Sequence, residues 1–249
     1  MDGHTIIPIP ALYRPVPHLY PIPSTLTVRF SDVSLVPIAE LLCDALNDLD
    51  LTTVIDHQSL DTAHNERTEV LPSHVALSIR PPSALPLLAE VAGDADTSRL
   101  QLGYELHMTA NGIALQAPSH HGLLHAAHTL LQLLLPASPA LQHDPHPAAA
   151  LPCASVADLP RFRWRGLLLD VGRYFYSVEF IKRVLDVMAL YKMTHFHWHL
   201  TEDQVLLHNC VIMYTVQECF RLSHDSPFFC CRCLLRSTFV SPSICVPHQ

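Results

Sequence analysis

The chain has 249 residues, which is long enough for one or two domains with a substantial apolar core. Its formal net charge of -8, from 15 Lys and Arg against 23 Asp and Glu, gives no basic footprint, so nucleic acid is not an expected partner. No apolar run approaches the roughly 20 residues of a membrane span, and the proline-rich start lacks the basic and apolar regions of a signal peptide. We therefore expect no membrane partner, and the sequence does not indicate the cellular compartment of the protein.

The first half of the chain shows short strand and helix patterns separated by prolines. The proline-rich start, over residues 8–23, is expected to be an extended lead-in segment. A strand is predicted at 26–30, and alternating apolar residues predict another at 75–79. Between them, Ser34 precedes a predicted helix that has Pro37 in its first turn and an apolar face formed by Ile38, Leu41, Leu42, Ala45, Leu46 and Leu49.

A hairpin and a second helix complete the first domain. Alternating apolar residues lie on both sides of Asn111-Gly112, a dipeptide that favours tight β-turns. A helix is predicted from Gly122 to Leu135, with its inward face formed by Leu124, Ala127, His128, Leu131 and Leu135. These elements predict an α+β domain over residues 1–135, followed at 136–158 by a linker rich in Ala, Pro and His.

The stretch from Arg161 to Gln204 predicts a strand, a helix and a second strand. The first strand contains the uninterrupted apolar run 167–169, which is typical of a parallel strand buried on both faces. Ser177 can cap the helix, whose inner face would be Ile181, Val184, Leu185, Met188 and Tyr191. The second strand is predicted at 194–200. Such a connection brings the carboxyl ends of both strands to one rim, where α/β barrels build their active sites.

Three histidines alternate along the second strand and therefore share one face. His195, His197 and His199 in this pattern allow two interpretations. A His-x-His strand opens some metal-dependent amidohydrolase barrels, but here it would be the second strand. We therefore predict a packed, hydrogen-bonded interior and no metal, with the amidohydrolase as the less favoured alternative.

The last segment, residues 205–249, has neither helical periodicity nor glycine, and it holds six of the chain's 8 cysteines. A disulfide framework or a zinc site with His224 is possible in principle, but the spacing fits no regular pattern. We interpret this tail as disordered, and as translated non-coding sequence from a retained intron or a frameshift.

The stretch 161–204 resembles the opening of the catalytic barrel of glycoside hydrolase family 20, the β-N-acetylhexosaminidases. The resemblance rests on RGLLLDVGRYF at 165–175, on the helix residues Asp186, Met188, Ala189 and Lys192, and on HWHLTEDQ at 197–204. The first domain resembles the family's N-terminal domain more loosely, at Ile7 to Pro10, Gly103-Tyr104-x-Leu106, Asn111-Gly112-Ile113 and Gly122 to Leu134. The implied fold is an α+β N-terminal domain, then the start of a (β/α)8 TIM barrel at 159–204.

This resemblance implies an enzyme that removes terminal N-acetylglucosamine or N-acetylgalactosamine with retention. In the family the substrate's acetamido oxygen attacks the anomeric carbon, an aspartate holds the acetamido group, and the adjacent glutamate protonates the leaving oxygen. No metal or organic cofactor is implied. Full-length members can be dimers and are often lysosomal or secreted.

The resemblance also assigns roles to the charged residues at the rim. Arg173 is expected to hold hydroxyl groups of the terminal sugar, because a guanidinium donates paired hydrogen bonds. Glu202 is expected to orient a histidine relay behind the catalytic acid. The supporting or structural residues are expected to be Asp170, His197, His199 and Asp203. Tyr174 stands where the family commonly has histidine, which affects packing beside Arg173.

The catalytic Asp-Glu pair of the family lies on the fourth barrel strand and is absent from these residues. Two strands do not close a barrel, so we expect the chain as written to be unstable beyond the linker and inactive as a hydrolase. Two alternatives to a truncated hexosaminidase remain, a non-catalytic binding module or short isoform built on the first domain and the amidohydrolase fragment.

Overall fold

The computed structural model describes residues 6–57, 73–135, 150–199 and the backbone of 211–215. The chain divides into two compact units. The first comprises residues 1–163 together with Leu190–Lys192, and the second comprises 164–189 and 193–249. Among the described residues, no helix is long and apolar enough to cross a membrane.

The first unit is built on a seven-stranded sheet with the strand order β1-β7-β5-β6-β4-β2-β3. Strand β2 is parallel to β3 and β4, and β4 is parallel to β6, whereas the pairs on the β1 side are antiparallel. The strands are β1 (Leu12–Pro21), β2 (Thr25–Phe30), β3 (Thr52–His57), β4 (His74–Ile79), β5 (Tyr104–Thr109), β6 (Gly112–Ala117) and β7 (Ala150–Asp158).

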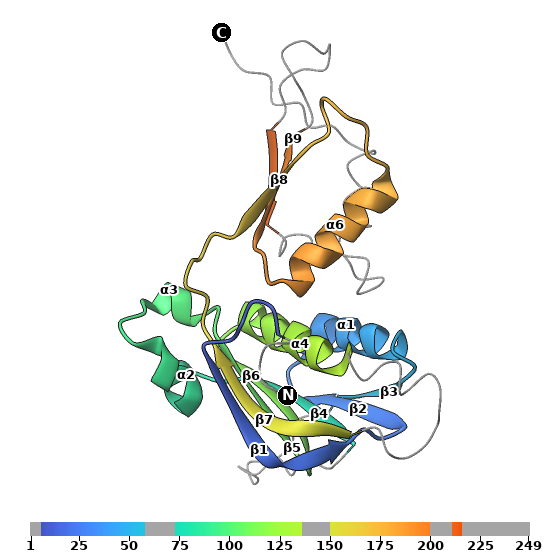
Figure 1. Ribbon diagram of the computed structural model, residues 1–249. Helices are drawn as coiled ribbons and strands as arrows, with labels where there is room; N and C mark the ends of the chain where they lie inside the picture. Colours follow the sequence, from blue (N-terminus) through green and yellow to red (C-terminus); the bar gives the residue numbers. More distant parts are fainter. Residues whose placement is uncertain (1–5, 58–72, 136–149, 200–210, 216–249) are drawn as a thin grey trace. The chain divides into compact units, whose positions relative to one another are not determined.

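Two helices, α1 (Val36–Asn47) and α4 (His120–Leu134), lie side by side on one face of this sheet (Figure 1). Two shorter helices, α2 (Pro86–Ala92) and α3 (Thr97–Leu100), connect β4 to β5, and single 3-10 turns precede α1 and α2. The α+β class predicted for this half of the chain is therefore confirmed. The buried apolar residues of the helices and the sheet include Leu42, Leu46, Leu106, Ile113 and Leu130.

The strands predicted at 26–30 and 75–79 and the hairpin are confirmed as β2, β4 and β5-β6. In the hairpin Thr109 pairs with Gly112, so the turn residues are Ala110 and Asn111, one position earlier than predicted. The backbone of Gly112 has φ 135°, a conformation that residues other than glycine rarely adopt.

The two helices are also confirmed, with shifted starts. The helix predicted after Ser34 begins with a 3-10 turn in which the Asp32 carboxylate accepts a hydrogen bond from the Ser34 N–H at 2.9 Å. Helix α4 begins two residues before the prediction, because Ser119 caps it by accepting from the Gly122 N–H. Leu135, predicted to face inward, lies beyond the helix and is 44% exposed.

Three strands of the sheet were not predicted, namely β1, β3 and β7. The lead-in segment forms β1, which among the described residues is an edge strand that pairs with β7 and shifts register between Pro15 and Leu19. Proline is tolerated there because an edge strand has unpaired backbone positions. The linker predicted at 136–158 is wrong for its last nine residues, which form β7 between β1 and β5. Its remaining residues, 136–149, lie outside the described part.

The second unit holds the predicted strand, helix and strand. Strands β8 (Gly166–Asp170) and β9 (His195–His199) are parallel, and α6 (Val178–Leu190) connects them. Ser177 accepts a hydrogen bond from the Phe180 N–H at 3.3 Å, as expected of a cap. The helix packs on one face of the sheet (Figure 1), around the buried side chains of Ile181, Leu185, Met188 and Phe196.

The other face of this small sheet is not covered by a helix among the described residues of the unit. Leu167 and Leu168 are 37% and 56% exposed, so the prediction of a strand buried on both faces is wrong. The reason is that β8 is an edge strand and α6 covers one side only. On the other edge, β10 (Val211–Thr215) pairs antiparallel with β9, which places one strand in the tail that was predicted to be disordered.

Candidate functional site

The candidate site lies at the carboxyl ends of β8 and β9, where the register pairs Asp170 with His199. Partners in a parallel pair direct their side chains to the same face, so these two groups are neighbours. Directly after β8 the chain turns, and the Asp170 carboxylate accepts hydrogen bonds from the N–H groups of Gly172 at 3.0 Å and Arg173 at 3.2 Å. The carboxylate therefore fixes the turn that carries Arg173.

Asp170 also bridges two side chains of the rim. Its Oδ2 lies 3.3 Å from Nη1 of Arg173, and its Oδ1 lies 3.4 Å from Nδ1 of His199. The Arg173 side chain is 63% exposed, and its contact with Asp170 limits the orientation of the guanidinium. The structure thus brings together three of the residues singled out from the sequence.

The charge on Asp170 is favoured by its surroundings. Partial burial raises the pKa of this carboxyl, but the N–H groups of Arg173 and Gly172 and the charges of Arg173 and His199 outweigh it, so the pKa lies below its ordinary value. An ionised Asp170 is what the bridge to a guanidinium requires. The sequence motif contained Gly172, whose N–H takes part, but its role becomes visible only in the folded turn.

The three histidines of β9 lie on the face opposite α6, because Phe196, between them, is buried against that helix and Trp198 packs beside it. His195 contacts Thr194 Oγ1 at 2.8 Å and stacks on Trp164, and burial together with Arg165 lowers its pKa. Nε2 of His197 is buried without a hydrogen-bond partner in the described residues.

A metal site is not formed by the histidines in the part of the chain that the structure describes, where no group of three His, Cys, Asp or Glu side chains is placed to hold an ion. Glu202 and Asp203 lie outside the described residues, so their predicted roles stay predictions. Cys43 and Cys153 are buried free thiols, and the six cysteines of the tail also lie outside.

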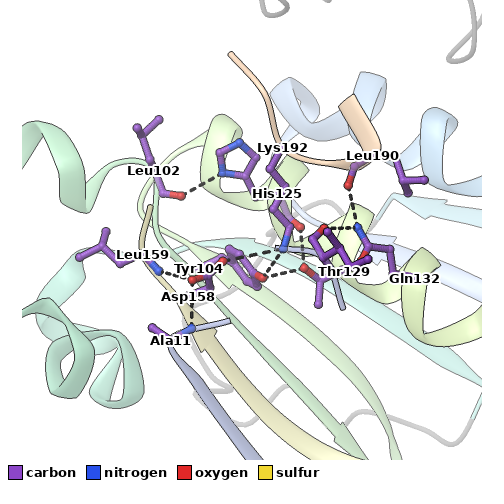
Figure 2. A network of polar contacts seen from close by, with 11 residues as sticks. Ala11, Leu102, Tyr104, His125, Thr129, Gln132, Asp158, Leu159, Leu190 and Lys192 are labelled. Atoms are coloured by element: carbon purple, nitrogen blue, oxygen red, sulfur yellow. Dashed lines mark hydrogen bonds and ion pairs between the residues drawn. The ribbon is translucent and has the colours of Figure 1, made fainter. Parts of the chain in front are cut away.

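The first unit contains a buried polar network that involves a motif residue, Lys192 (Figure 2). The Lys192 ammonium, 3% exposed, donates to the Tyr104 hydroxyl at 3.0 Å and lies 3.8 Å from Asp158 Oδ2. The Tyr104 hydroxyl also contacts Thr129 Oγ1 at 2.6 Å. Burial, and then the charge of Asp158, raise the pKa of Tyr104, so its hydroxyl stays protonated.

Gln132 and Asp158 hold backbone groups of three segments in the same region (Figure 2). The Gln132 amide accepts from the Ile7 N–H at 2.6 Å and donates to the carbonyls of Ile7 and Leu190 at 2.8 and 2.7 Å. Asp158 Oδ1 accepts from the N–H groups of Ala11 and Leu159. These contacts satisfy buried backbone groups, so the network is structural.

The fold and the rim define a two-part chain, in which an α+β domain is followed by the opening of an α/β catalytic domain. The family model described as glycosyl hydrolase family 20, domain 2, matches residues 4–159. The model described as glycosyl hydrolase family 20, catalytic domain, matches residues 162–207. The chain belongs to glycosyl hydrolase family 20, which confirms the resemblance stated from the sequence motifs.

Curated relatives and solved structures agree with this assignment. The β-hexosaminidase of Porphyromonas gingivalis is 35% identical over 205 residues, which is 81% of this chain and 23% of the relative. The β-hexosaminidase of Vibrio furnissii is 41% identical over 101 residues, 41% of this chain and 15% of the relative. The N-acetyl-β-hexosaminidase of Streptomyces plicatus is 27% identical with a TM-score of 0.56, covering 82% of this chain and 36% of that one.

A second structural neighbour was solved with a ligand. The exo-β-N-acetylglucosaminidase of Vibrio harveyi, in complex with N-acetylglucosamine, has a TM-score of 0.59 and 25% identity, covering 82% of this chain and 26% of that one. This chain spans about a quarter or less of the length of the two curated relatives named above.

Proposed function

We propose that this chain supplies the N-terminal domain and the first two barrel strands of a β-N-acetylhexosaminidase, a retaining glycoside hydrolase that removes terminal N-acetylglucosamine and N-acetylgalactosamine. The observation that carries the proposal is the rim triplet Asp170, Arg173 and His199, built by a family 20 motif at the end of β8. An ionised Asp170 orients an exposed guanidinium at the rim where α/β barrels bind substrate.

The proposed chemistry is substrate-assisted. The acetamido oxygen of the terminal sugar attacks its own anomeric carbon, and the leaving oxygen takes a proton from a carboxylic acid that these 249 residues do not contain. Arg173 holds sugar hydroxyls, which positions the ring for this attack. Glu202 supports the relay behind the acid, and His197, His199 and Asp203 support the rim. The proposal assigns no metal or organic cofactor.

A chimera tests the role of Arg173. Residues 1–204 replace the corresponding segment of the Porphyromonas gingivalis relative, and hydrolysis of aryl N-acetylglucosaminide and N-acetylgalactosaminide is measured. We expect activity toward both, and a loss of about 100-fold in kcat/KM in Arg173→Ala, because each charged hydrogen bond to substrate contributes about 1.5 to 3 kcal/mol.

The matched control is Arg183→Ala, which removes an exposed arginine of α6 and should leave kcat/KM unchanged. Equal activity in the Arg173 and Arg183 variants would refute the substrate role of Arg173. We further propose that the 249-residue chain alone has no glycoside hydrolase activity. Turnover of the same aryl substrates by the purified chain would contradict this.

The proposal extends to a dimer of the complete enzyme, which light scattering of the full-length protein would test.

A further inference from the structure

A serine, a histidine and a buried glutamate form a hydrogen-bonded row on the sheet face opposite α1 and α4. On β5, Tyr104 directs its hydroxyl toward Thr129 of α4. Side chains alternate along a strand, so Glu105 and His107 both lie on the sheet face opposite that of Tyr104. Their mutual contact at 2.9 Å agrees with this placement. Ser155 on β7 is the register partner of His107.

The hydrogen bonds of this row determine which ring nitrogen carries the proton. Glu105 is fully buried, and its Oε1 accepts from the Leu88 N–H in the first turn of α2 at 2.6 Å. Its Oε2 lies 2.9 Å from His107 Nε2, which must therefore donate when the glutamate is ionised. The neutral ring is left with Nδ1 as an acceptor, 3.3 Å from the Ser155 hydroxyl. The serine hydroxyl, the histidine base and the orienting carboxylate thus follow one another along one chain of hydrogen bonds.

We propose that Ser155 is an activated nucleophile that accepts acyl groups from small esters, with His107 as its general base and Glu105 as the residue that positions the ring. A hydroxyl within reach of a base that a third group orients is the arrangement that activates serine in unrelated folds. This proposal is independent of the glycosidase function and of Arg173, since it concerns only the first unit.

The proposed reaction transfers an acyl group from an ester to the Ser155 oxygen. The Ser155 oxygen forms a bond to the ester carbonyl carbon, and its proton passes to His107 Nδ1. The bond from that carbon to the alcohol oxygen breaks, and the alcohol leaves with the electron pair and takes up the proton. The product is an acyl ester of Ser155. Water then attacks the carbonyl carbon of this ester while its proton passes to His107 Nδ1. The bond from that carbon to the Ser155 oxygen breaks, a carboxylic acid leaves, and the Ser155 oxygen takes up the proton.

The neighbouring strand indicates the kind of ester. Arg14 on β1 is the register partner of Ser155 on its other side, and its side chain is half exposed. One guanidinium nitrogen of Arg14 binds Glu90 at 2.5 Å, and a guanidinium carries five N–H donors in all. A positive group beside the serine favours the oxyanion that develops during attack. The His107 side chain is 29% exposed, which gives a compact ester access to the row.

Covalent labelling of the purified 249-residue chain tests the proposal. The chain is treated with a fluorophosphonate probe and separately with p-nitrophenyl acetate, and adducts are located by peptide mass spectrometry. We expect one adduct, on Ser155, and no adduct in Ser155→Ala. The matched control is Ser78→Ala, a serine of β4 on the same sheet face, which should label like the unchanged chain.

Glu105→Gln distinguishes activation from simple exposure. The carbonyl oxygen of the substituted amide can still accept from the Leu88 N–H, but its NH2 group would donate to His107 Nε2, so Nδ1 would carry the proton and could no longer accept from Ser155. We expect folding, judged by circular dichroism, to persist while the rate of Ser155 labelling falls about 100-fold. Equal labelling of Ser155 in the folded Glu105→Gln variant, in the urea-unfolded chain, or at several serines at once would overturn the proposal. So would the absence of any adduct on the folded chain.

Discussion

His128 is a single buried residue that makes the stability of the first unit depend on pH. It lies in α4, 7% exposed, and both ring nitrogens are buried without a hydrogen-bond partner in the described residues. Burial, and then the charge of Lys192, lower its pKa to about 4. In the unfolded chain the His128 imidazole binds a proton near pH 6.5. The contribution of neutral His128 to the free energy of unfolding is therefore complete above that pH and is lost as the pH falls toward 4.

We therefore expect His128→Leu to remove part of the acid sensitivity. The predicted difference between pH 7.5 and pH 4 is roughly 3 kcal/mol, because each unit of pKa shift corresponds to about 1.4 kcal/mol. Urea unfolding of both proteins at several pH values between 7.5 and 4 measures it. Parallel pH profiles for the two proteins would show that His128 is not responsible.

Gly122 is a residue whose side chain is excluded by packing. A Cβ at this position would collide with the Gly103 carbonyl, which is backbone and has no freedom to rotate away. We expect Gly122→Ala to lower the free energy of unfolding by roughly 1 to 3 kcal/mol, despite the better helix propensity of alanine. Urea unfolding measures the change, and a more stable variant would show that α4 can move away from β5.

At the same scale, the candidate site was only partly predictable. Asp170 and Arg173 are three residues apart in one turn, so their proximity follows from local sequence. The contact between Asp170 and His199 depends on the register of β8 against β9, which an apolar run without alternation does not specify. The pairing of Lys192 with Tyr104 joins residues 88 positions apart, and no local pattern indicates it.

At the scale of elements, the start of α4 depends on one hydroxyl. Ser119 Oγ accepts from the Gly122 N–H and also contacts the Gln101 carbonyl. We expect Ser119→Ala to destabilise the first unit by about 1 kcal/mol, as is typical for loss of an N-cap. Ser119→Thr keeps the hydroxyl and should restore most of the stability. Identical thermal unfolding of the alanine and threonine variants would contradict this role.

Elements with a strong periodic pattern were predicted well, and those defined by their partners were not. The alternation in β5 and β6 and the helical spacing in α6 identify these elements without further information. Strand β1 contains three prolines, at positions 15, 17 and 21, and β7 contains three alanines, at 150, 154 and 157, and both compositions are unfavourable for strands. They form because each provides the hydrogen-bonding partner of the other, and β5 pairs with the second edge of β7.

At the scale of the whole molecule, the two units differ in the size of their cores. The described part of the second unit has a cluster of four buried apolar side chains, whereas that of the first unit buries many more, across a seven-stranded sheet and two helices. Local opening requires less energy where few apolar contacts are lost. We expect amide hydrogens in β8 and α6 to exchange faster than those in β5, β6 and α4, as measured by hydrogen exchange and mass spectrometry. Equal protection of the amides in both units would show that the four-residue cluster is enough to prevent local opening of the second unit.

The antiparallel pairing of β10 with β9 has a consequence for any longer form of this chain. A strand has only two edges, and β9 uses one for β8 and the other for β10. A third parallel strand of a barrel needs the edge that β10 occupies, so the two arrangements exclude each other. As long as Val211–Thr215 pair with β9, no further parallel strand can be added at that edge.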